Sequence, residues 1–215
     1  MSRENEKAIT RDTYCNEYDS IAGFISYFYQ IDLVKKLGVN KVLEVGIGNK
    51  TVSNYLKLSG FDVTTCDNNE SLEPDVVGDI RKLPFEDESF EVIMAYEVLE
   101  HLPWNDIPET IDELFRVTSK YVVISLPFTS LYFEAAIKFP MYNKILKKHC
   151  LDLFVRLPLA IFTGRSVRHK WEIGLKGYPL RKIRIELKRK FRILKEVRPV
   201  LQPKHYFFVL QKKVK

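Results

Sequence analysis

The stretch that decides the fold is Lys41–Lys50, which reads Lys-Val-Leu-Glu-Val-Gly-Ile-Gly-Asn-Lys. Its first half, Val42–Val45, is mostly apolar and rich in β-branched side chains, which predicts a short, buried parallel strand. Gly46 and Gly48 then permit a tight turn and close approach of the backbone to a ligand. A helix predicted directly after the turn would point its amino end at that ligand. The stretch therefore predicts the strand–turn–helix unit of a nucleotide-binding α/β fold.

Two carboxylates accompany this unit. Glu44 interrupts the apolar run, where a buried charge is costly unless a cation or a hydrogen-bond donor meets it. A second strand, predicted over 62–66, ends at Asp67, about twenty residues beyond the glycines. In a doubly wound sheet this is the position of an acidic residue that holds a ribose diol. The sequence thus predicts a cofactor that carries a ribose.

Further segments follow in a fixed order: Gly78-Asp79-Ile80, then the run from Leu83-Pro84-Phe85 to Ile93, then Glu97-Val-Leu-Glu100-His101-Leu102. Together with the first stretch they resemble the class I S-adenosylmethionine-dependent methyltransferases, in particular the type 11 group. The resemblance covers residues 41 to about 127. It implies a Rossmann-like, doubly wound α/β sheet that is mostly parallel with a final antiparallel strand and has helices on both faces. It also implies S-adenosylmethionine as cofactor and S-adenosylhomocysteine as product.

The resemblance assigns parts of this cofactor to particular positions. The turn after the first strand would meet the amino and carboxylate groups, Asp67 the ribose, Asp79 the adenine amino group, and Leu83 the adenine face. The full set that it implies is Glu44, Gly46, Gly48, Asn49, Asp67, Asp79, Ile80, Leu83, Tyr96 and Glu97. One position departs from the family pattern, because Lys50 stands where a third glycine is common. We expect the Lys50 side chain either to point to solvent or to reach the cofactor carboxylate.

Candidate catalytic residues are fewer. Methyl transfer needs a nucleophile placed in line with the methyl group, and a base where the nucleophile is neutral. A histidine near its ordinary pKa can serve as that base at neutral pH. We therefore name His169, beside the predicted mouth of the site, and His101, whose family role is mostly structural. An anionic acceptor would need no base, and we expect ordinary surface or core roles for His149 and His205.

Composition limits the classes of protein. A chain of 215 residues suits one α/β domain. No apolar run approaches the roughly 18 residues that span a bilayer, and the polar start is not that of a signal peptide. Cys15, Cys66 and Cys150 form neither a disulfide framework nor a zinc-binding spacing. We therefore expect a reduced, cytoplasmic protein without a metal site.

Charge is divided unevenly along the chain. Residues 1–127 carry 12 basic and 23 acidic side chains, whereas residues 128–215 carry 22 basic and 5 acidic ones, which together give the net +6. Such a division suggests an anionic partner for the second part: a membrane surface, a nucleic acid or an anionic substrate. The alternative is that the two parts neutralise each other in the folded chain. Among partners besides the methyl acceptor, we consider peripheral membrane contact ahead of nucleic acid.

The expected organisation has four parts: a helical cap (1–40), the cofactor-binding core (41–127), a helical insertion on the substrate side (128–180), and a closing helix and strand pair (181–215). We expect a helix over 11–38, which Gly23 could break, and an amphipathic helix over 141–157. That second helix would either cover the substrate or lie on a membrane. The remaining expectations are helices over 51–59, 108–117 and 180–190, strands over 41–45, 62–66, 90–96, 121–126, 191–197 and 206–211, and only a turn near 71–74.

The function that these features favour is methyl transfer to a small-molecule or lipid-like acceptor. A dinucleotide-dependent oxidoreductase fits less well, because the Gly-x-Gly-x-x-Gly pattern is not completed at Thr51. A non-catalytic cofactor-binding adaptor and an RNA methyltransferase that uses the basic part stay open. Against RNA, the chain reads Ala95-Tyr96-Glu97-Val98 where amine methyltransferases of nucleic acids carry an Asn/Asp-Pro-Pro-aromatic motif.

Overall fold

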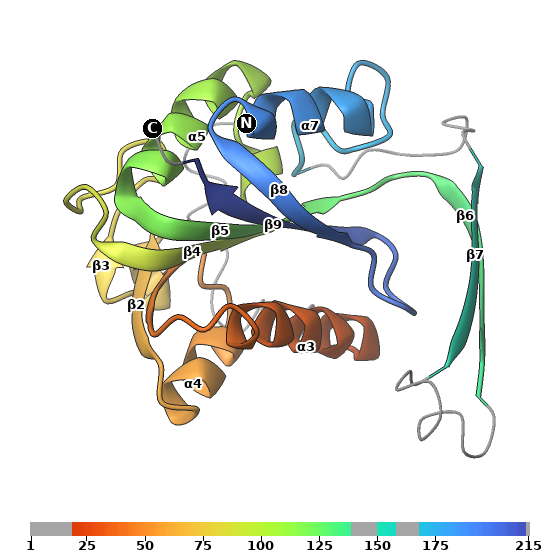
Figure 1. Ribbon diagram of the computed structural model, residues 1–215, viewed down its shortest axis with the longest axis horizontal. Helices are drawn as coiled ribbons and strands as arrows, with labels where there is room; N and C mark the ends of the chain where they lie inside the picture. The colour runs from red at the N-terminus through yellow and green to blue at the C-terminus, as the bar shows by residue number, and fades with distance from the viewer. Residues whose placement is uncertain (1–18, 139–149, 158–167, 214–215) are drawn as a thin grey trace.

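A computed structural model of the chain describes residues 19–138, 150–157 and 168–213. Figure 1 shows a central twisted sheet with helices on both of its faces and a separate two-stranded ribbon, β6 and β7, standing at one side. The elements are α3 (Ile21–Lys35), β1 (Lys41–Val45), α4 (Thr51–Leu58), β2 (Asp62–Asp67), η1 (Glu70–Leu72), β3 (Val76–Val77), β4 (Phe90–Tyr96), η2 (Leu99–His101), η3 (Trp104–Asp106), α5 (Ile107–Val117), β5 (Thr118–Pro127), β6 (Leu131–Ile137), β7 (Leu151–Leu157), α7 (Leu180–Lys188), β8 (Phe191–Val197) and β9 (His205–Lys212).

The central sheet has seven strands in the order β3-β2-β1-β4-β5-β9-β8. Neighbours from β3 to β5 run parallel, whereas β9 is antiparallel to both β5 and β8. This confirms the predicted doubly wound sheet with a final antiparallel pair. The chain leaves β1 for β2 on one side and returns for β4 on the other, so the strand order reverses at β1. Ligands of such sheets bind at this point, outside the carboxyl ends of the strands.

Two hydrophobic layers hold the helices on the sheet. Because side chains alternate along a strand, Val42 of β1 faces α3 and α4, where it packs with Val34 and Leu56. Leu43 faces the other layer, where Ile111 of α5 is among the residues of the same core. This alternation assigns each β1 side chain to one layer, and it sends Glu44 to the side of α3 and α4.

The amino-terminal helix is shorter than predicted within the described residues. It begins at Ile21, where the Ser20 side chain caps it by accepting a hydrogen bond of 3.1 Å from the Gly23 N–H. Gly23 therefore lies in the first turn and does not break the helix. Positions 11–18 of the predicted helix lie outside the described residues. Between β2 and β4, the second and third predicted strands, the structure has the 3₁₀ turn η1 beside the predicted turn and, in addition, the two-residue strand β3, which was not predicted.

The helix predicted over 141–157 is wrong for its described part. Residues 151–157 form β7, which pairs antiparallel with β6 along its whole length. The reason is visible in the sequence, because Leu151, Leu153, Val155 and Leu157 alternate with Asp152, Phe154 and Arg156, a period of two that fits a strand. The helical insertion therefore includes a two-stranded ribbon. Residues 141–149 lie outside the described residues, and no helix within the described ranges has the length and apolarity to cross a membrane.

Candidate active site

The predicted site residues gather at the carboxyl ends of β1, β2 and β4, around the point where the strand order reverses. The glycine turn after β1 is held from both sides. The Gly46 N–H donates to the Cys66 carbonyl over 3.0 Å, and φ of Gly46 is 82°. A Cβ atom on Gly46 would lie 2.4 Å from Cγ2 of Val98. Only glycine fits here, because both the positive φ and the close approach of Val98 exclude a side chain.

Asp67 has a structural role that the sequence did not indicate. Its two carboxylate oxygens accept hydrogen bonds of 2.9 Å each from the N–H groups of Ile47 and Asn69. The side chain is 8% exposed, and burial raises its pKa above the ordinary value although these hydrogen bonds oppose the shift. Asp67 thus ties the glycine turn to the end of β2, as well as lying where a ribose-binding carboxylate is predicted.

Asn49 joins the turn to both flanking helices. Its side-chain amide donates to Asp19 (2.9 Å) and to the Tyr27 hydroxyl (3.1 Å), and its carbonyl oxygen accepts from the Thr51 N–H. The side chain is therefore occupied by the protein itself. By contrast, the backbone N–H groups of Gly48 and Asn49 meet no acceptor among the described residues. Two open donors at the amino end of α4 are suited to an anionic group.

Glu44 is buried (4% exposed), and its Oε2 atom has no hydrogen-bond partner among the described residues. Burial raises the pKa of this carboxyl to about 8, and the nearby Ser53 opposes that shift. The carboxyl lies on the face of the sheet that α3 and α4 cover, shortly before the glycine turn. Its contact with the cofactor stays a prediction.

Lys50 follows neither of the two courses expected for it. Its φ is 62°, the left-handed conformation that favours glycine, which explains the glycine common at this position. The Lys50 ammonium turns to η1 and donates a hydrogen bond of 2.6 Å to the carbonyl of Glu73. The side chain is mostly buried (19% exposed) and links the glycine turn to the segment after β2.

Asp79 is held by a neighbouring cation. The Arg81 guanidinium binds both Asp79 carboxylate oxygens and also reaches Asp106, 2.9 Å away. Ile80 and Leu83 are buried in the core shared with α5. The adenine contacts predicted for these three positions stay predictions.

Tyr96 and Glu97, at the end of β4, point in different directions. The Tyr96 hydroxyl donates to the Gln30 carbonyl over 3.3 Å beneath α3. Glu97 has a φ of 54°, and its carboxylate accepts a hydrogen bond of 2.7 Å from the Ser125 hydroxyl. The Nε2 atom of His205 lies 3.8 Å from the other carboxylate oxygen. Glu97 therefore lies just past the carboxyl end of the central strand β4, and His205, for which we expected an ordinary surface or core role, lies beside it.

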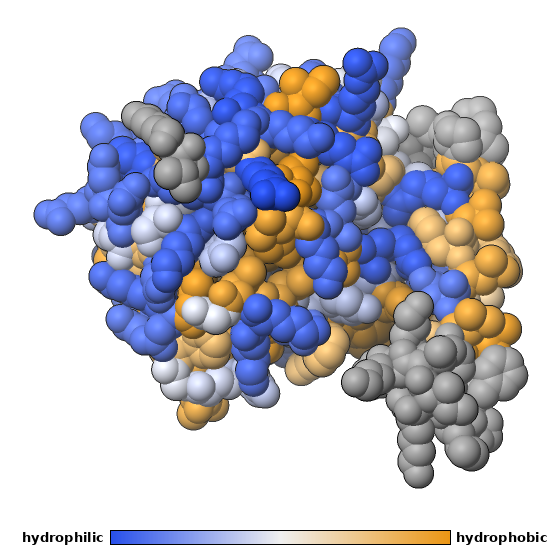
Figure 2. Space-filling view, in the orientation of Figure 1, coloured by the Kyte–Doolittle hydropathy of each residue, from blue (hydrophilic) through white to orange (hydrophobic). Residues whose placement is uncertain are grey.

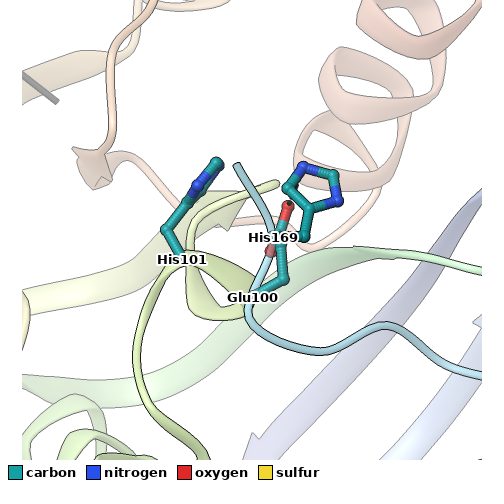
Figure 3. A group of neighbouring side chains, drawn as sticks. All are labelled: Glu100, His101 and His169. Atoms are coloured by element: carbon teal, nitrogen blue, oxygen red, sulfur yellow. Dashed lines mark ion pairs between the residues drawn. The ribbon is translucent and has the colours of Figure 1, made fainter. Parts of the chain in front are cut away.

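The two candidate catalytic histidines, far apart in sequence, lie together (Figure 3). The rings of His101 and His169 are 5.0 Å apart between centroids, at 82° to each other. Glu100 lies between them and is completely buried, and Glu172 accepts a hydrogen bond of 2.7 Å from Nδ1 of His169. Burial raises the pKa of Glu100 well above its usual range. Burial and the neighbouring His169 lower the pKa of His101 to about 4.

The segment that carries His169 is fixed to the sheet by its backbone. The Lys170 N–H donates to the Glu100 carbonyl. Ile173 donates to the carbonyl of Pro127, the last residue of β5, and accepts from the Thr129 N–H. The Trp171 indole donates to the Leu102 carbonyl and is 1% exposed. Sequence analysis missed Glu100 and Glu172 as site residues. The combination of Glu100-His101 with His169-Lys-Trp-Glu172 was the available signal, but only the fold shows that the two segments meet.

Two cavities border this region. One of about 590 Å³ lies between the base of the ribbon and the segment before α7, and its lining includes Thr129, Arg156 and Gly174. The Thr129 hydroxyl also donates a hydrogen bond to the Glu172 carboxylate, which connects this cavity to the histidine cluster. The second, of about 620 Å³, lies between α3 and the far end of the ribbon, with Phe24, Phe28 and Lys138 in its lining.

Comparisons with known proteins agree with this architecture. Residues 43–124, from β1 to β5, match the family described as "Methyltransferase domain". No curated protein matches the sequence. Among similar crystal structures, the PH0226 protein of Pyrococcus horikoshii OT3 is 16% identical, with 99% of this chain and 100% of that one covered and a TM-score of 0.62. The N-methyltransferase NodS of Bradyrhizobium japonicum WM9, in complex with S-adenosylhomocysteine, is 12% identical, with 98% and 96% covered and a TM-score of 0.60. The 1,6-didemethyltoxoflavin-N1-methyltransferase of Burkholderia thailandensis is 12% identical, with 100% and 92% covered and a TM-score of 0.62. At these identities the likeness bears on the fold.

Proposed function

We propose that the chain is an S-adenosylmethionine-dependent enzyme that methylates a small-molecule or lipid-like acceptor, because residues 43–124 match the model of a methyltransferase domain. The observation that carries the proposal is the convergence of the glycine turn, Asp67 and Glu97 at the point where the strand order reverses. NodS and the Burkholderia enzyme, which share this fold, are themselves methyltransferases.

The residues present fit the cofactor. The turn leaves the Gly48 and Asn49 N–H groups open for a carboxylate, and Oε2 of Glu44, at the end of β1, has no hydrogen-bond partner among the described residues. Asp67 is held by two backbone donors, so its orientation is fixed before a ribose arrives. When bound, S-adenosylmethionine supplies a methyl group on a sulfonium sulfur, which an acceptor in line with it takes up. The protein's own contribution is placement, and we assign the orientation of the acceptor to the cluster around His101 and His169, which follows directly on β4.

The ribbon supports an acceptor of lipid-like character. On its outer face the register pairs apolar residues with one another: Leu131 with Leu157, Phe133 with Val155, Ala135 with Leu153, and Ile137 with Leu151. Every large side chain of this outer face is at least 41% exposed. Figure 2 shows hydrophobic residues along the edge of the molecule where β6 and β7 lie. An apolar face of this extent marks an interaction surface.

The basic residues next to the ribbon in the sequence favour an anionic lipid surface as the partner of this face. Residues 138–150 contain four lysines, residues 158–170 contain Arg165, Arg168 and Lys170, and neither segment has an acidic residue. The two acidic residues of the ribbon itself, Glu134 and Asp152, both pair with Arg198. An apolar face whose strands continue in the sequence into basic segments suits a membrane with anionic headgroups. A second copy stacked on the same face would bring like charges together.

A titration tests the cofactor part of this proposal. The purified chain is titrated calorimetrically with S-adenosylmethionine, S-adenosylhomocysteine and NAD. We expect the first two to bind with micromolar affinity and NAD not to bind. Binding of NAD alone, or no binding of any of the three compounds, would overturn the proposal.

A transfer experiment tests the acceptor class. The chain is incubated with S-adenosylmethionine labelled on its methyl group and, separately, with the lipid-phase and aqueous-phase extracts of cells. We expect label to move into an organic-soluble product. Transfer only into an aqueous metabolite would support methyltransferase activity and exclude a lipid-like acceptor. In a parallel reaction with added RNA, transfer into the RNA would favour the basic part as an RNA-binding surface. Cofactor binding without transfer in any reaction would favour an adaptor.

A further inference from the structure

The cluster of Glu100, His101 and His169 has the composition of a metal site (Figure 3). One donor atom from each of the three side chains lies within 4.8 Å of the others. Glu100 and His101 come from η2, directly after β4, whereas His169 comes from the segment before α7. Two imidazoles and one carboxylate are a set that divalent transition metals favour over Mg²⁺ or Ca²⁺.

Both histidines are oriented as metal ligands usually are. His101 donates from Nδ1 to the Arg168 carbonyl over 3.3 Å, because a carbonyl oxygen can only accept. His169 binds the Glu172 carboxylate through Nδ1 at 2.7 Å, and Thr129 in turn donates to Glu172. These contacts leave Nε2 of both rings available, and Nε2 of His169 lies 4.0 Å from Glu100. A metal-bound histidine generally donates its other N–H to just such a carbonyl or carboxylate.

Glu100 supplies the second and independent observation. It is 0% exposed, and neither of its carboxylate oxygens has a hydrogen-bond partner among the described residues. A buried carboxylate without a partner is costly. The acidic side chains near it, Glu97 and Glu172, add to its negative surroundings. A cation between the carboxylate and the two imidazoles would remove this cost.

We propose that Glu100, His101 and His169 bind one divalent transition-metal ion, of the Mn²⁺ or Zn²⁺ class, with Glu172 orienting His169. Metal–ligand bonds of about 2.1 Å require the three donor atoms to approach one another by about 1 Å, which side-chain rotation provides. The binding claim stands on these residues alone. A catalytic role rests on the proposed function: the ion would hold an oxygen of the acceptor and make a hydroxyl proton easier to lose. His101 and His169 would then act as ligands and not as bases.

Metal binding by the full chain tests the inference. The chain is freed of metal with a chelator, dialysed, and titrated with MnCl₂ while the electron paramagnetic resonance signal of free Mn²⁺ is followed, and separately with ZnCl₂ by calorimetry. We expect one ion per chain with micromolar or tighter affinity for at least one of the two metals. The absence of stoichiometric binding of both would overturn the inference.

Variants locate the site. Glu100→Gln keeps the shape of the side chain and removes its charge, so we expect a folded protein that binds the metal at least tenfold more weakly; His169→Ala should act likewise. Glu172→Gln should weaken binding about tenfold by loosening His169. His205→Ala is the matched control, because His205 lies outside the cluster and binds Ser26. Unchanged affinity in Glu100→Gln, or an equal loss in His205→Ala, would place the metal elsewhere.

Cofactor titration of the same preparations separates the two proposals. If S-adenosylmethionine binds and neither metal does, only the metal site fails. If the metal binds and the cofactor does not, the methyltransferase function fails and the metal site stands.

Discussion

Single residues show where this chain departs from the methyltransferase pattern that it resembles. Lys50 adopts a left-handed backbone conformation (φ 62°) that costs about 1 kcal/mol for a residue with a side chain. Its ammonium offsets part of that cost by its hydrogen bond to the Glu73 carbonyl. The glycine turn therefore keeps its shape without a third glycine, and the lysine stays away from the predicted cofactor carboxylate.

Substitutions of Lys50 separate the backbone from the side chain. Lys50→Gly relieves the left-handed conformation while losing the hydrogen bond, so we expect stability close to that of the parent. Lys50→Ala loses the hydrogen bond and keeps the strain, and we expect it to be about 1 kcal/mol less stable than Lys50→Gly. Urea unfolding measures both. Equal stability of the two variants would contradict the role given to the backbone.

Glu44 gives a pH prediction. Its folded-state pKa of about 8 lies above the ordinary 4.5, so the unfolded chain releases this proton at lower pH than the folded one. The stability that the protonated carboxyl provides is complete below pH 4.5 and is lost as pH rises through 8. Between pH 5.5 and 8.5 we expect the parent to lose on the order of 2 kcal/mol more stability than Glu44→Gln. Urea unfolding at both pH values measures this change. An equal loss of unfolding free energy in the parent and in Glu44→Gln would contradict the prediction.

Two elements outside the family match, the segment 168–174 and the ribbon, complete the site and its surroundings. The segment places His169 and Glu172 against η2, and its end at Gly174 is tightly confined: φ is 92°, and a Cβ atom would lie 2.2 Å from the Thr129 carbonyl oxygen. The ribbon is anchored by Arg198, which lies 2.7 Å from Glu134, also pairs with Asp152, and covers the Phe154 ring.

Alanine substitutions at Gly174 and Gly177 test how tightly the segment 168–174 is confined. Both have a positive φ, but a Cβ atom on Gly177 would meet nothing within 4 Å. We expect Gly177→Ala to cost about 1 kcal/mol from its backbone conformation alone. Gly174→Ala should cost clearly more and displace the segment, which would change the fluorescence of the buried Trp171. Urea unfolding followed by tryptophan fluorescence checks this, and equal costs for the two would be the contrary result.

Arg198 tests how the ribbon is held. Removal of its cation leaves Glu134 and Asp152 without their partner, so Arg198→Leu should free the ribbon from the turn between β8 and β9. Hydrogen exchange should then become faster in 131–137 and 151–157 and stay unchanged in β1 and β4. Arg189→Leu is the control, since Arg189 pairs with Glu186 on α7. Faster exchange throughout the sheet would mean that Arg198 stabilises the whole fold.

At the scale of the whole molecule, charge and apolar surface coincide. The basic second part of the sequence contains the ribbon, whose outer face is apolar and exposed. The acidic first part contains the glycine turn and the residues predicted to bind the cofactor. The proposed lipid-binding face and the predicted cofactor site therefore belong to different parts of the chain.

Vesicle binding tests this division. We expect the chain to sediment with vesicles that contain phosphatidylglycerol, to bind pure phosphatidylcholine weakly, and to dissociate as salt rises from 50 to 300 mM. The double variant Phe133→Ser/Leu153→Ser should bind at least tenfold more weakly, because each exposed side chain contributes about 1.5–3 kcal/mol when buried. Leu58→Ser, which changes an exposed leucine on α4 (88% exposed), is the control. Equal binding by all three proteins would contradict the lipid surface.

The sequence by itself determined the central sheet and predicted the position of the cofactor site. The apolar run before Gly46 and the spacing to Asp67 are local patterns, and a parallel sheet brings the carboxyl ends of its strands to one edge whatever the loops contain. Tertiary structure alone decided the rest. It brought His169 to Glu100, turned Lys50 towards Glu73, and paired residues 151–157 with β6 in place of the expected helix. These outcomes depend on contacts between residues far apart in the chain, which no local pattern of side chains encodes.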